Sequence, residues 1–426
     1  MENNKTPSIR FKGFTDPWEQ RKLLSCIEKI TDFRGRTPKK LGMDWSESGY
    51  LALSALNVKD GYIDFSQDVH YGEQALYDKW MSGNELHKGQ VLFTTEAPMG
   101  NVAQVPDNKR YILSQRTIAF DVKEDIITEN FLATLLRSPA VFNTLTSLSS
   151  GGTAKGVSQK SLAGVDIQIP VELREQELLA TYFANLDNLI TLHQRKYNKL
   201  LNVKKSMLEK MFPKNGSNIP EIRFKGFTDP WEQRKLLSCI EKITDFRGRT
   251  PKKLGMDWSE SGYLALSALN VKDGYIDFSQ DVHYGEQALY DKWMSGNELH
   301  KGQVLFTTEA PMGNVAQVPD NKRYILSQRT IAFDVKEDII TENFLATLLR
   351  SPAVFNTLTS LSSGGTAKGV SQKSLAGVDI QIPVELREQE LLATYFANLD
   401  NLITLHQREL EKLQNIKKSM LEKMFV

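Results

Sequence analysis

The sequence predicts two globular domains of mixed α/β class, separated by two long antiparallel coiled-coil helices and related by a pseudo-two-fold axis. Three observations predict this architecture: an internal repeat, a long stretch without glycine or proline at the end of each repeat, and a short linker between the repeats. With 426 residues, the chain is also long enough to form more than one core.

The internal repeat defines the domain boundaries. Residues 9–195 recur letter for letter as 222–408, which gives 187 identical positions, and the two tails that follow differ at only five sites. Such identity indicates a recent duplication, a recombination or a deliberate assembly, and the sequence does not separate these origins. We expect a first domain at 1–170, a first long helix at 171–212, a linker at 213–221, a second domain at 222–383 and a second long helix at 384–426.

Each domain mixes strand and helix signals. Short β-like runs at Val91–Thr95, Asn101–Val105 and Thr117–Val122 alternate with turn residues, and Glu129–Ser138 is predicted to be a helix that ends before Pro139. These runs predict a mixed α/β domain, although they do not determine its topology.

The two long helices have the apolar spacing of a coiled coil. Between residues 171 and 212 there is no glycine or proline, and apolar residues recur at alternating spacings of four and three. Polar His193 and Lys204 occupy two positions of this seam, and the second copy repeats the pattern, so each helix is the natural partner of the other. The predicted seam residues are Leu179, Phe183, Leu186, Ile190, Tyr197 and Leu200 in the first helix, and Leu392, Phe396, Leu399, Ile403, Leu410 and Leu413 in the second.

The linker length predicts that the helices are antiparallel. A helix of about 40 residues is ~60 Å long, whereas the linker 213–221 spans at most ~30 Å when extended. In a parallel pair, the end of the first helix would lie too far from the second domain. In an antiparallel pair it lies beside that domain, and the short linker suffices.

Composition excludes several classes of protein and leaves nucleic-acid binding open. A net charge of +1 does not by itself indicate a nucleic-acid partner, so any DNA contact must come from local basic patches. The polar start and the lack of an apolar run near ~18 residues predict a cytoplasmic protein. Cys26 and Cys239 are one position in two copies, which favours structural thiols over a disulfide framework or a metal site.

Three segments of each copy resemble the specificity subunits of type I restriction-modification enzymes. They are the opening IRFKGFTDPWEQRK at 9–22, SGGTAKGVSQ at 150–159, and DIQIP at 166–170, which leads into the long helix. The resemblance covers nearly the entire chain in the order recognition domain, helix, recognition domain, helix. It implies double-stranded DNA as the ligand, with one domain for each half of a bipartite target and the helices as a ruler between them.

The resemblance also implies the partners and the absence of catalysis in this chain. Two methyltransferase subunits dock on the helices and modify the target base, most commonly adenine, and motor-nuclease subunits complete the restriction enzyme. S-adenosylmethionine, ATP and magnesium are expected in those subunits and no cofactor in this chain. Family members commonly carry two different recognition domains, whereas the two domains here are identical, which predicts an interrupted palindrome as the target.

Four groups of residues are candidates for DNA contact in each domain. The basic loop suits phosphate contacts or guanine readout by arginine, with a solvated surface loop as the alternative. A glycine-rich run suits close approach to a phosphate, with a tight turn as the alternative. Two threonines and a Gln-Arg pair are weaker candidates, because a structural role is the alternative to base reading for them. The candidates are Arg34, Arg36, Lys39 and Lys40; Gly151, Gly152, Thr153 and Lys155; Thr94 and Thr95; Gln115 and Arg116; and in the second copy Arg247, Arg249, Lys252, Lys253, Gly364, Gly365, Thr366, Lys368, Thr307, Thr308, Gln328 and Arg329.

Two rival functions are weaker. An enzyme acting alone lacks sequence support, because the chain contains no HExxH motif, no glycine-rich cofactor loop that opens a helix and no Ser/His/Asp set. A protein-interaction adaptor built on the coiled coil is compatible with the neutral charge. Selective DNA protection by the chain with its methyltransferase would separate an adaptor from a DNA reader.

Overall fold

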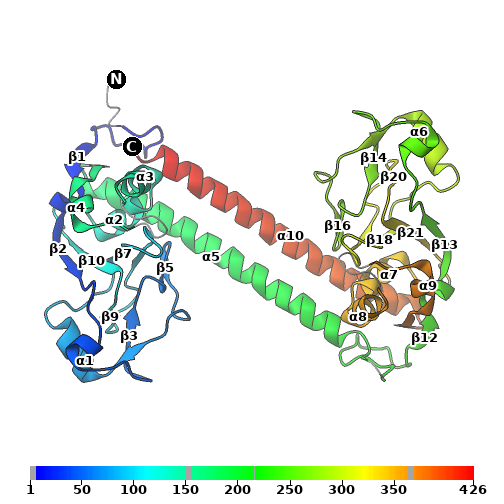
Figure 1. Cartoon of the computed structure of the whole chain (residues 1–426), viewed down its shortest axis with the longest axis horizontal. Coiled ribbons are helices and arrows are strands. Elements are labelled where there is room, and N and C mark those ends of the chain that lie inside the picture. Colours follow the sequence, from blue (N-terminus) through cyan, green and yellow to red (C-terminus); the bar gives the residue numbers. More distant parts are fainter. Residues whose placement is uncertain (1–5, 150–155, 215, 363–368) are drawn as a thin grey trace. The chain divides into compact units, whose positions relative to one another are not determined.

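A computed structural model describes residues 6–149, 156–214, 216–362 and 369–426 of the chain (Figure 1). The chain divides into two compact units. Unit 1 contains Met1–Gln194 together with Arg408–Val426, and unit 2 contains Arg195–Gln407. Each unit therefore combines one whole globular domain with pieces of both long helices.

The domain of unit 1 is mixed α/β, as the sequence predicts. The predicted strands at 91–95, 101–105 and 117–122 and the helix at 129–138 form as β7, β8, β10 and α2, with ends that differ by at most two residues. The strands are β1 (Glu19–Lys22), β2 (Ile27–Asp32), β3 (Tyr50–Leu53), β4 (Val58–Lys59), β5 (Tyr62–Ile63), β6 (Tyr71–Gly72), β7 (Val91–Thr94), β8 (Val102–Gln104), β9 (Ile112–Leu113), β10 (Thr117–Val122) and β11 (Asp166–Ile169). The helices are α1 (Gln74–Met81), α2 (Glu129–Leu136), α3 (Pro139–Leu148) and α4 (Gln159–Gly164), with the 3-10 turns η1 (Leu23–Cys26) and η2 (Lys39–Leu41).

The domain of unit 2 repeats these elements in the same order. Its strands are β12 (Glu232–Lys235), β13 (Ile240–Asp245), β14 (Tyr263–Leu266), β15 (Val271–Lys272), β16 (Tyr275–Ile276), β17 (Tyr284–Gly285), β18 (Val304–Thr307), β19 (Val315–Gln317), β20 (Ile325–Leu326), β21 (Thr330–Val335) and β22 (Asp379–Ile382). Its helices are α6 (Gln287–Met294), α7 (Glu342–Leu349), α8 (Pro352–Leu361) and α9 (Gln372–Gly377), with the 3-10 turns η3 (Leu236–Cys239) and η4 (Pro251–Leu254).

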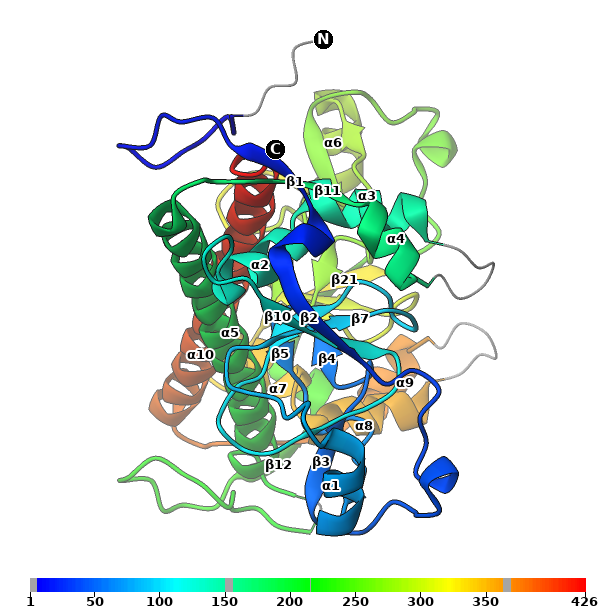
Figure 2. The ribbon, with the colours of Figure 1, turned by 90° about the vertical axis from the view of Figure 1, so that its left-hand side faces the viewer.

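A four-stranded antiparallel sheet in the order β2-β10-β7-β8 lies at the centre of unit 1 (Figure 2). Phe93 and Phe120 face a core that includes α2, α3 and the start of α5, whereas Leu92 and Ala119 face a second core with Trp80 of α1. Alternate residues of a strand point to opposite faces, so a sheet covered on both faces needs apolar residues at every position. This explains why Val91–Phe93 of β7 and Ile118–Phe120 of β10 are uninterrupted apolar runs, all of whose side chains are buried.

Smaller strand pairs complete the domain. Strand β1 pairs with β11 from Glu19↔Ile169 to Lys22↔Asp166, which joins the start of the domain to its end. A second sheet has the order β6-β3-β9, in which β3 and β9 are parallel. Helices α2 and α3 begin at side-chain caps that the sequence supplies: Thr128 accepts a hydrogen bond from Phe131 N, and Ser138 accepts one from Val141 N directly before Pro139.

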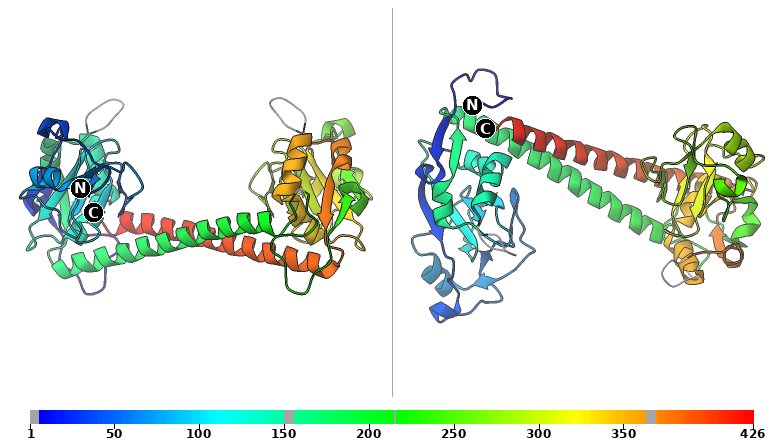
Figure 3. Two further views of the ribbon diagram at one scale, coloured as in Figure 1. Left: turned by 90° about the horizontal axis from the view of Figure 1, so that it is seen from below. Right: turned by 45° about the horizontal axis from the view of Figure 1, so that its top comes forward.

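The long helices α5 (Leu173–Lys210) and α10 (Leu386–Lys423) pack against each other in antiparallel fashion inside each unit. In unit 1, Phe183 from the start of α5 shares a core with Met424 and Phe425, which directly follow α10. In unit 2, Phe212, which follows α5, shares a core with Phe396 from the start of α10. Both views of Figure 3 show the first part of α5 beside the last part of α10. The antiparallel prediction from the linker is confirmed.

The predicted seam residues fall into two classes of burial. Those near the start of each helix are buried in a domain core, and those further along are mostly half-buried, with Leu200 and Leu413 packed against these cores. The buried residues are Leu179, Phe183, Leu186, Leu392, Phe396, Leu399 and Leu410, and the half-buried ones are Ile190, Tyr197, Leu200, Ile403 and Leu413.

Candidate nucleic-acid interface

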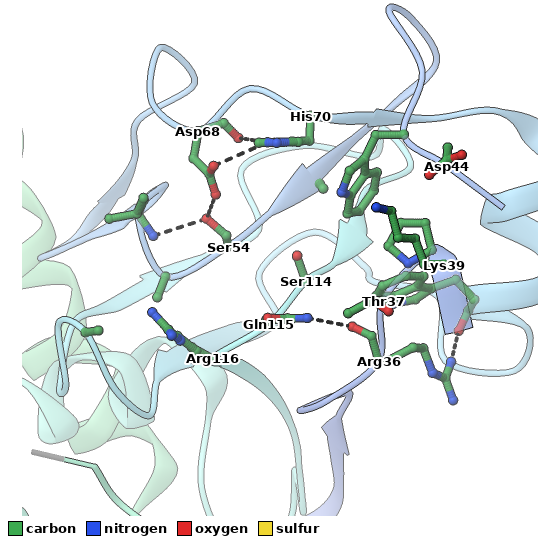
Figure 4. Close-up of a pocket in the computed structure, with 17 residues that line it drawn as sticks. Arg36, Thr37, Lys39, Asp44, Ser54, Asp68, His70, Ser114, Gln115 and Arg116 are labelled. Atoms are coloured by element: carbon green, nitrogen blue, oxygen red, sulfur yellow. Dashed lines mark hydrogen bonds and ion pairs between the residues drawn. The ribbon is translucent and has the colours of Figure 1, made fainter. Parts of the chain in front are cut away.

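A pocket of about 450 Å³ in the domain of unit 1 collects residues from distant parts of the sequence (Figure 4). Ser54 and Ser114 directly follow the parallel strands β3 and β9, so both emerge at the same edge of that small sheet. The β2–β3 connection contributes Arg36 and Lys39, and the segment before β10 contributes Arg116. The domain of unit 2 has the equivalent pocket, of about 470 Å³.

Three of the four cations in the basic loop are bound by the protein itself. The Nη2 of Arg34 lies 2.5 Å from Asp32 Oδ2. Arg36 donates to the carbonyl oxygen of Trp80 at 2.5 Å, and its guanidinium lies 4.1 Å from the ring centre of Phe33. Lys40 donates to the carbonyl oxygen of Gly35 at 2.6 Å. The copies Arg247, Arg249 and Lys253 make the same contacts in unit 2.

The fourth cation, Lys39, is placed differently. Its side chain lines the pocket and, among the described residues, has no hydrogen-bond or ion-pair partner. Lys252 has the same place in unit 2. An ammonium group without an internal partner remains available for a phosphate.

The Gln-Arg pair lines the same pocket. Gln115 donates to the carbonyl oxygen of Arg36 at 2.9 Å, which connects the two segments. Arg116 has a left-handed backbone with a φ of 64°, and its Nε lies 3.2 Å from Glu96 Oε1, with about half of the Arg116 side chain exposed. Gln328 and Arg329 repeat this arrangement, the latter 3.4 Å from Glu309.

The threonine candidates lie in the interior. Thr94 is 0% and Thr95 is 1% exposed. Thr94 Oγ1 accepts a hydrogen bond from the amide of Asn101 at 2.8 Å, and Thr95 Oγ1 donates to the carbonyl oxygen of Arg116 at 3.2 Å. Thr307 and Thr308 are equally buried. Thr94 and Thr307 hold the backbone of Asn101 and Asn314, and Thr95 and Thr308 hold the backbone of Arg116 and Arg329. None of the four side chains offers an exposed surface to a ligand.

The glycine-rich candidates lie outside the described residues. These are Gly151, Gly152, Thr153 and Lys155 in the first copy, and Gly364, Gly365, Thr366 and Lys368 in the second. The residue that follows the first run, Gly156, forms an isolated antiparallel bridge with Glu96.

The pocket also contains residues that sequence reasoning missed. Asp68 accepts a hydrogen bond from the Ser54 hydroxyl and lies 3.2 Å from His70 Nδ1. The ring of Trp45 lies 5.6 Å from that of His70. No local pattern marks these residues, because only the fold of the segment from Trp45 to β6 brings them together.

Ser54, Asp68 and His70 do not have the Ser–His–Asp order of a hydrolase triad. The serine hydroxyl donates to the Asp68 carboxylate rather than to the imidazole, whereas in such a triad the serine donates to the histidine. Among the described residues, no group of three or more His, Cys, Asp and Glu side chains could hold a metal ion. In the same part of the chain, no helix is long and apolar enough to span a membrane.

Comparisons with known proteins agree over almost the whole chain. Residues 16–202 and 228–415 each match the model of the type I restriction modification DNA specificity domain. The type I restriction enzyme MjaVIII specificity subunit of Methanocaldococcus jannaschii is 25% identical over 419 residues, which cover 95% of this chain and 91% of that protein. A putative MjaX specificity subunit of the same organism is 23% identical over 95% of this chain and 92% of that protein.

Solved structures show the same fold. The S subunit of a type I restriction-modification system from M. genitalium has a TM-score of 0.59 at 14% identity and covers 99% of both chains. A chain from a study of complex assembly and conformational transition of the type I R-M system has a TM-score of 0.50 at 16% identity, covering 96% of this chain and 97% of that one. Because the family model matches both repeats, the chain belongs to the type I restriction-modification DNA specificity family and is a non-catalytic specificity subunit with two target-recognition domains.

Proposed function

We propose that this subunit reads a bipartite double-stranded DNA target, with the pocket of each domain over one half-site. The observation that carries the proposal is that Lys39 and Arg116 line one pocket, and that Lys252 and Arg329 line its copy. A lysine without an internal partner suits a phosphate, and an exposed arginine suits a base edge. Arg34, Arg36 and Lys40, together with their copies, shape the loop and add positive charge next to the DNA.

The two half-sites are identical and inverted. Residues 9–195 and 222–408 have the same sequence, so the two domains have the same base preference. Each unit pairs the start of one helix with the end of the other, which supports a two-fold relation between the readers. Two-fold symmetric readers bind inverted repeats, so the target is an interrupted palindrome whose nonspecific spacer depends on the helices.

Two methyltransferase subunits dock on the long helices and carry out the base modification. Several leucines on the outer faces of these helices are exposed by 39% to 52%, which supports a further protein surface there: Leu178, Leu189 and Leu192 on α5, and Leu391, Leu402 and Leu405 on α10. Motor-nuclease subunits join the complex for restriction. S-adenosylmethionine, ATP and magnesium act in those partners, which flip and modify the target base, adenine by family resemblance.

Methylation mapping tests the proposal directly. The chain is co-expressed with its cognate methyltransferase subunit in a methylation-free host, and modified bases are located by single-molecule sequencing. The expected result is one interrupted palindrome, modified on both strands. A motif with unlike halves would contradict the two-fold reader, and the absence of any motif from a demonstrably assembled complex would favour a protein-interaction adaptor.

A further inference from the structure

The backbone strain of each domain is concentrated at the pocket. Among the described residues, the non-glycine residues with positive φ in the first domain are Asp68, Ala97 and Arg116, and all three line the pocket. Their copies Asp281, Ala310 and Arg329 line the second pocket. L-residues rarely adopt this conformation, and such residues cluster at ligand-binding and active sites.

Arg116 is held in this conformation from the protein interior. Its carbonyl oxygen accepts hydrogen bonds from the buried Thr95, from the backbone amide at 2.8 Å and from the hydroxyl at 3.2 Å. Thr308 holds Arg329 in the same way. The buried threonine therefore determines where the arginine side chain leaves the backbone.

The side chain of Arg116 is oriented by one carboxylate and is otherwise open. Its Nε lies 3.2 Å from Glu96 Oε1. Among the described residues, neither of its terminal Nη atoms donates a hydrogen bond, whereas the other pocket arginine, Arg36, donates to Trp80 and packs over Phe33. A guanidinium that is ion-paired on its Nε side and whose Nη groups donate no hydrogen bond can offer these two groups as a parallel pair of donors, which matches the N7 and O6 acceptors of guanine in the major groove.

We propose that Arg116 and Arg329 each read one guanine of the corresponding half-site, and that Glu96 and Glu309 act as positioning residues for them. This inference rests on the proposed function and deepens it, because it assigns one base of each half-site to a named residue. Lys39 binds a phosphate beside this base. Glu96 holds the arginine in place before DNA arrives, so less side-chain freedom is lost on binding.

The two copies allow the test to carry its own control. In the full chain, R116G alone removes one guanidinium, and glycine accepts a positive φ without strain, so the domain should fold at least as well. Methylation mapping with the methyltransferase partner is expected to give a motif in which one half-site has lost its preference for guanine at one position, by about 10- to 100-fold. The other half-site, read by the unchanged Arg329, keeps its guanine.

Further variants separate a specific contact from a general loss of affinity. R329G must relax one half-site as R116G does, and R116G/R329G must relax both. R21A is a matched control, because Arg21 is an exposed arginine that is ion-paired with Glu19 outside the pocket, and it must leave the motif unchanged. E96Q keeps the shape of the side chain but removes its charge, and it is expected to reduce the preference for guanine at the same position while the other positions keep theirs.

The outcomes distinguish this inference from the proposed function. If the unaltered chain gives no bipartite motif, the proposed function fails before the variants are examined. The second case is that the unaltered chain gives the motif. If the assembled complex of R116G/R329G then retains every guanine in both half-sites, the assignment of Arg116 is overturned. A uniform drop in methylation without a change of motif would assign Arg116 to a phosphate instead and would equally overturn guanine readout.

Discussion

The Nζ of Lys417 lies 2.8 Å from Asp187 Oδ1 and joins the last part of α10 to the first half of α5 within unit 1. The same ammonium lies 3.4 Å from Asp60 in the β4–β5 turn, and Arg137 lies 2.5 Å from Asp60 and 2.7 Å from Asp187. Two cations and two carboxylates thus connect both helices to the domain. In unit 2 the equivalent group is Lys204, Asp400, Asp273 and Arg350. A charged residue in an apolar seam favours the one helix register and direction that pairs it.

Removal of the seam lysines Lys204 and Lys417 should destabilise both units. K204M/K417M leaves the carboxylates with one cation fewer in partly buried surroundings, so we expect a loss of about 2 kcal/mol in the unfolding free energy of each unit. Urea denaturation measures this loss in the unfolding free energy. K205M/K418M changes the neighbouring exposed lysines and should have little effect, and an equal loss in both variants would contradict a specific role for Lys417.

The same cluster predicts a dependence of stability on pH. Burial raises the pKa of Asp60, but the hydrogen bond from Arg137 and the charges of Arg137 and Lys417 outweigh it, so the pKa lies below the ordinary 3.8. Asp273 is shifted in the same direction. A carboxyl group with a lowered pKa in the folded state stabilises the fold above its unfolded pKa, and this contribution is lost as the pH falls through the folded pKa.

The variant D60N/D273N should therefore be less stable than the unaltered chain near neutral pH, and the difference should shrink below pH 3.8. Asn-Gly suits the turn as well as Asp-Gly does, so the turn itself is preserved. Urea midpoints measured from about pH 7 to about pH 3 test this. A difference that stays constant over the whole range would show that the charge of Asp60 is not the cause.

Two ion pairs within one copy should differ sharply in strength because of their burial. Arg10 holds Glu175 through two hydrogen bonds, of 2.6 Å and 2.8 Å, and the Glu175 side chain is 1% exposed. R10M leaves a buried carboxylate unpaired and should cost about 3–5 kcal/mol. Arg21 and Glu19 form an exposed pair, so R21M should change the unfolding free energy by less than about 1 kcal/mol. Denaturant titrations compare the unfolding free energies of R10M and R21M. Similar losses in the two variants would contradict the dependence of ion-pair strength on burial.

The last residues of the chain should stabilise unit 1. The ring of Phe425 lies 5.7 Å from that of Phe183, 6.1 Å from Trp18 and 6.0 Å from Phe131. F425A opens a cavity among these rings and should cost about 3–5 kcal/mol. The tails 409–425 and 196–212 differ in sequence, so hydrogen exchange with mass spectrometry can distinguish them.

We expect faster exchange in 409–425 of F425A, with 196–212 unchanged. V426A alters an exposed neighbour and serves as the control. If F425A leaves the exchange of 409–425 unchanged, the aromatic cluster does not stabilise the helix end.

The candidate site was predictable only in part. The basic loop and the Gln-Arg pair were recognisable by residue type. Nothing in the sequence distinguishes Lys39, whose side chain has no partner within the described part of the chain, from Arg36, which donates to Trp80. The burial of Thr94 depends on which strands flank β7. The place of Asp68 beside Ser54 depends on contacts between segments that local patterns do not encode.

The sequence by itself determined the duplication, the α/β domains, the long helices and their antiparallel direction, because repeats, apolar spacing and linker reach are properties of the chain alone. Only the tertiary structure decided that Lys39 and Arg116 share a pocket, and that Lys417 closes a charge cluster with Asp187 and Asp60. The physical reason is that these neighbours are separated by tens or hundreds of residues. Their proximity is set by sheet pairing and core packing, which no local pattern of residues records.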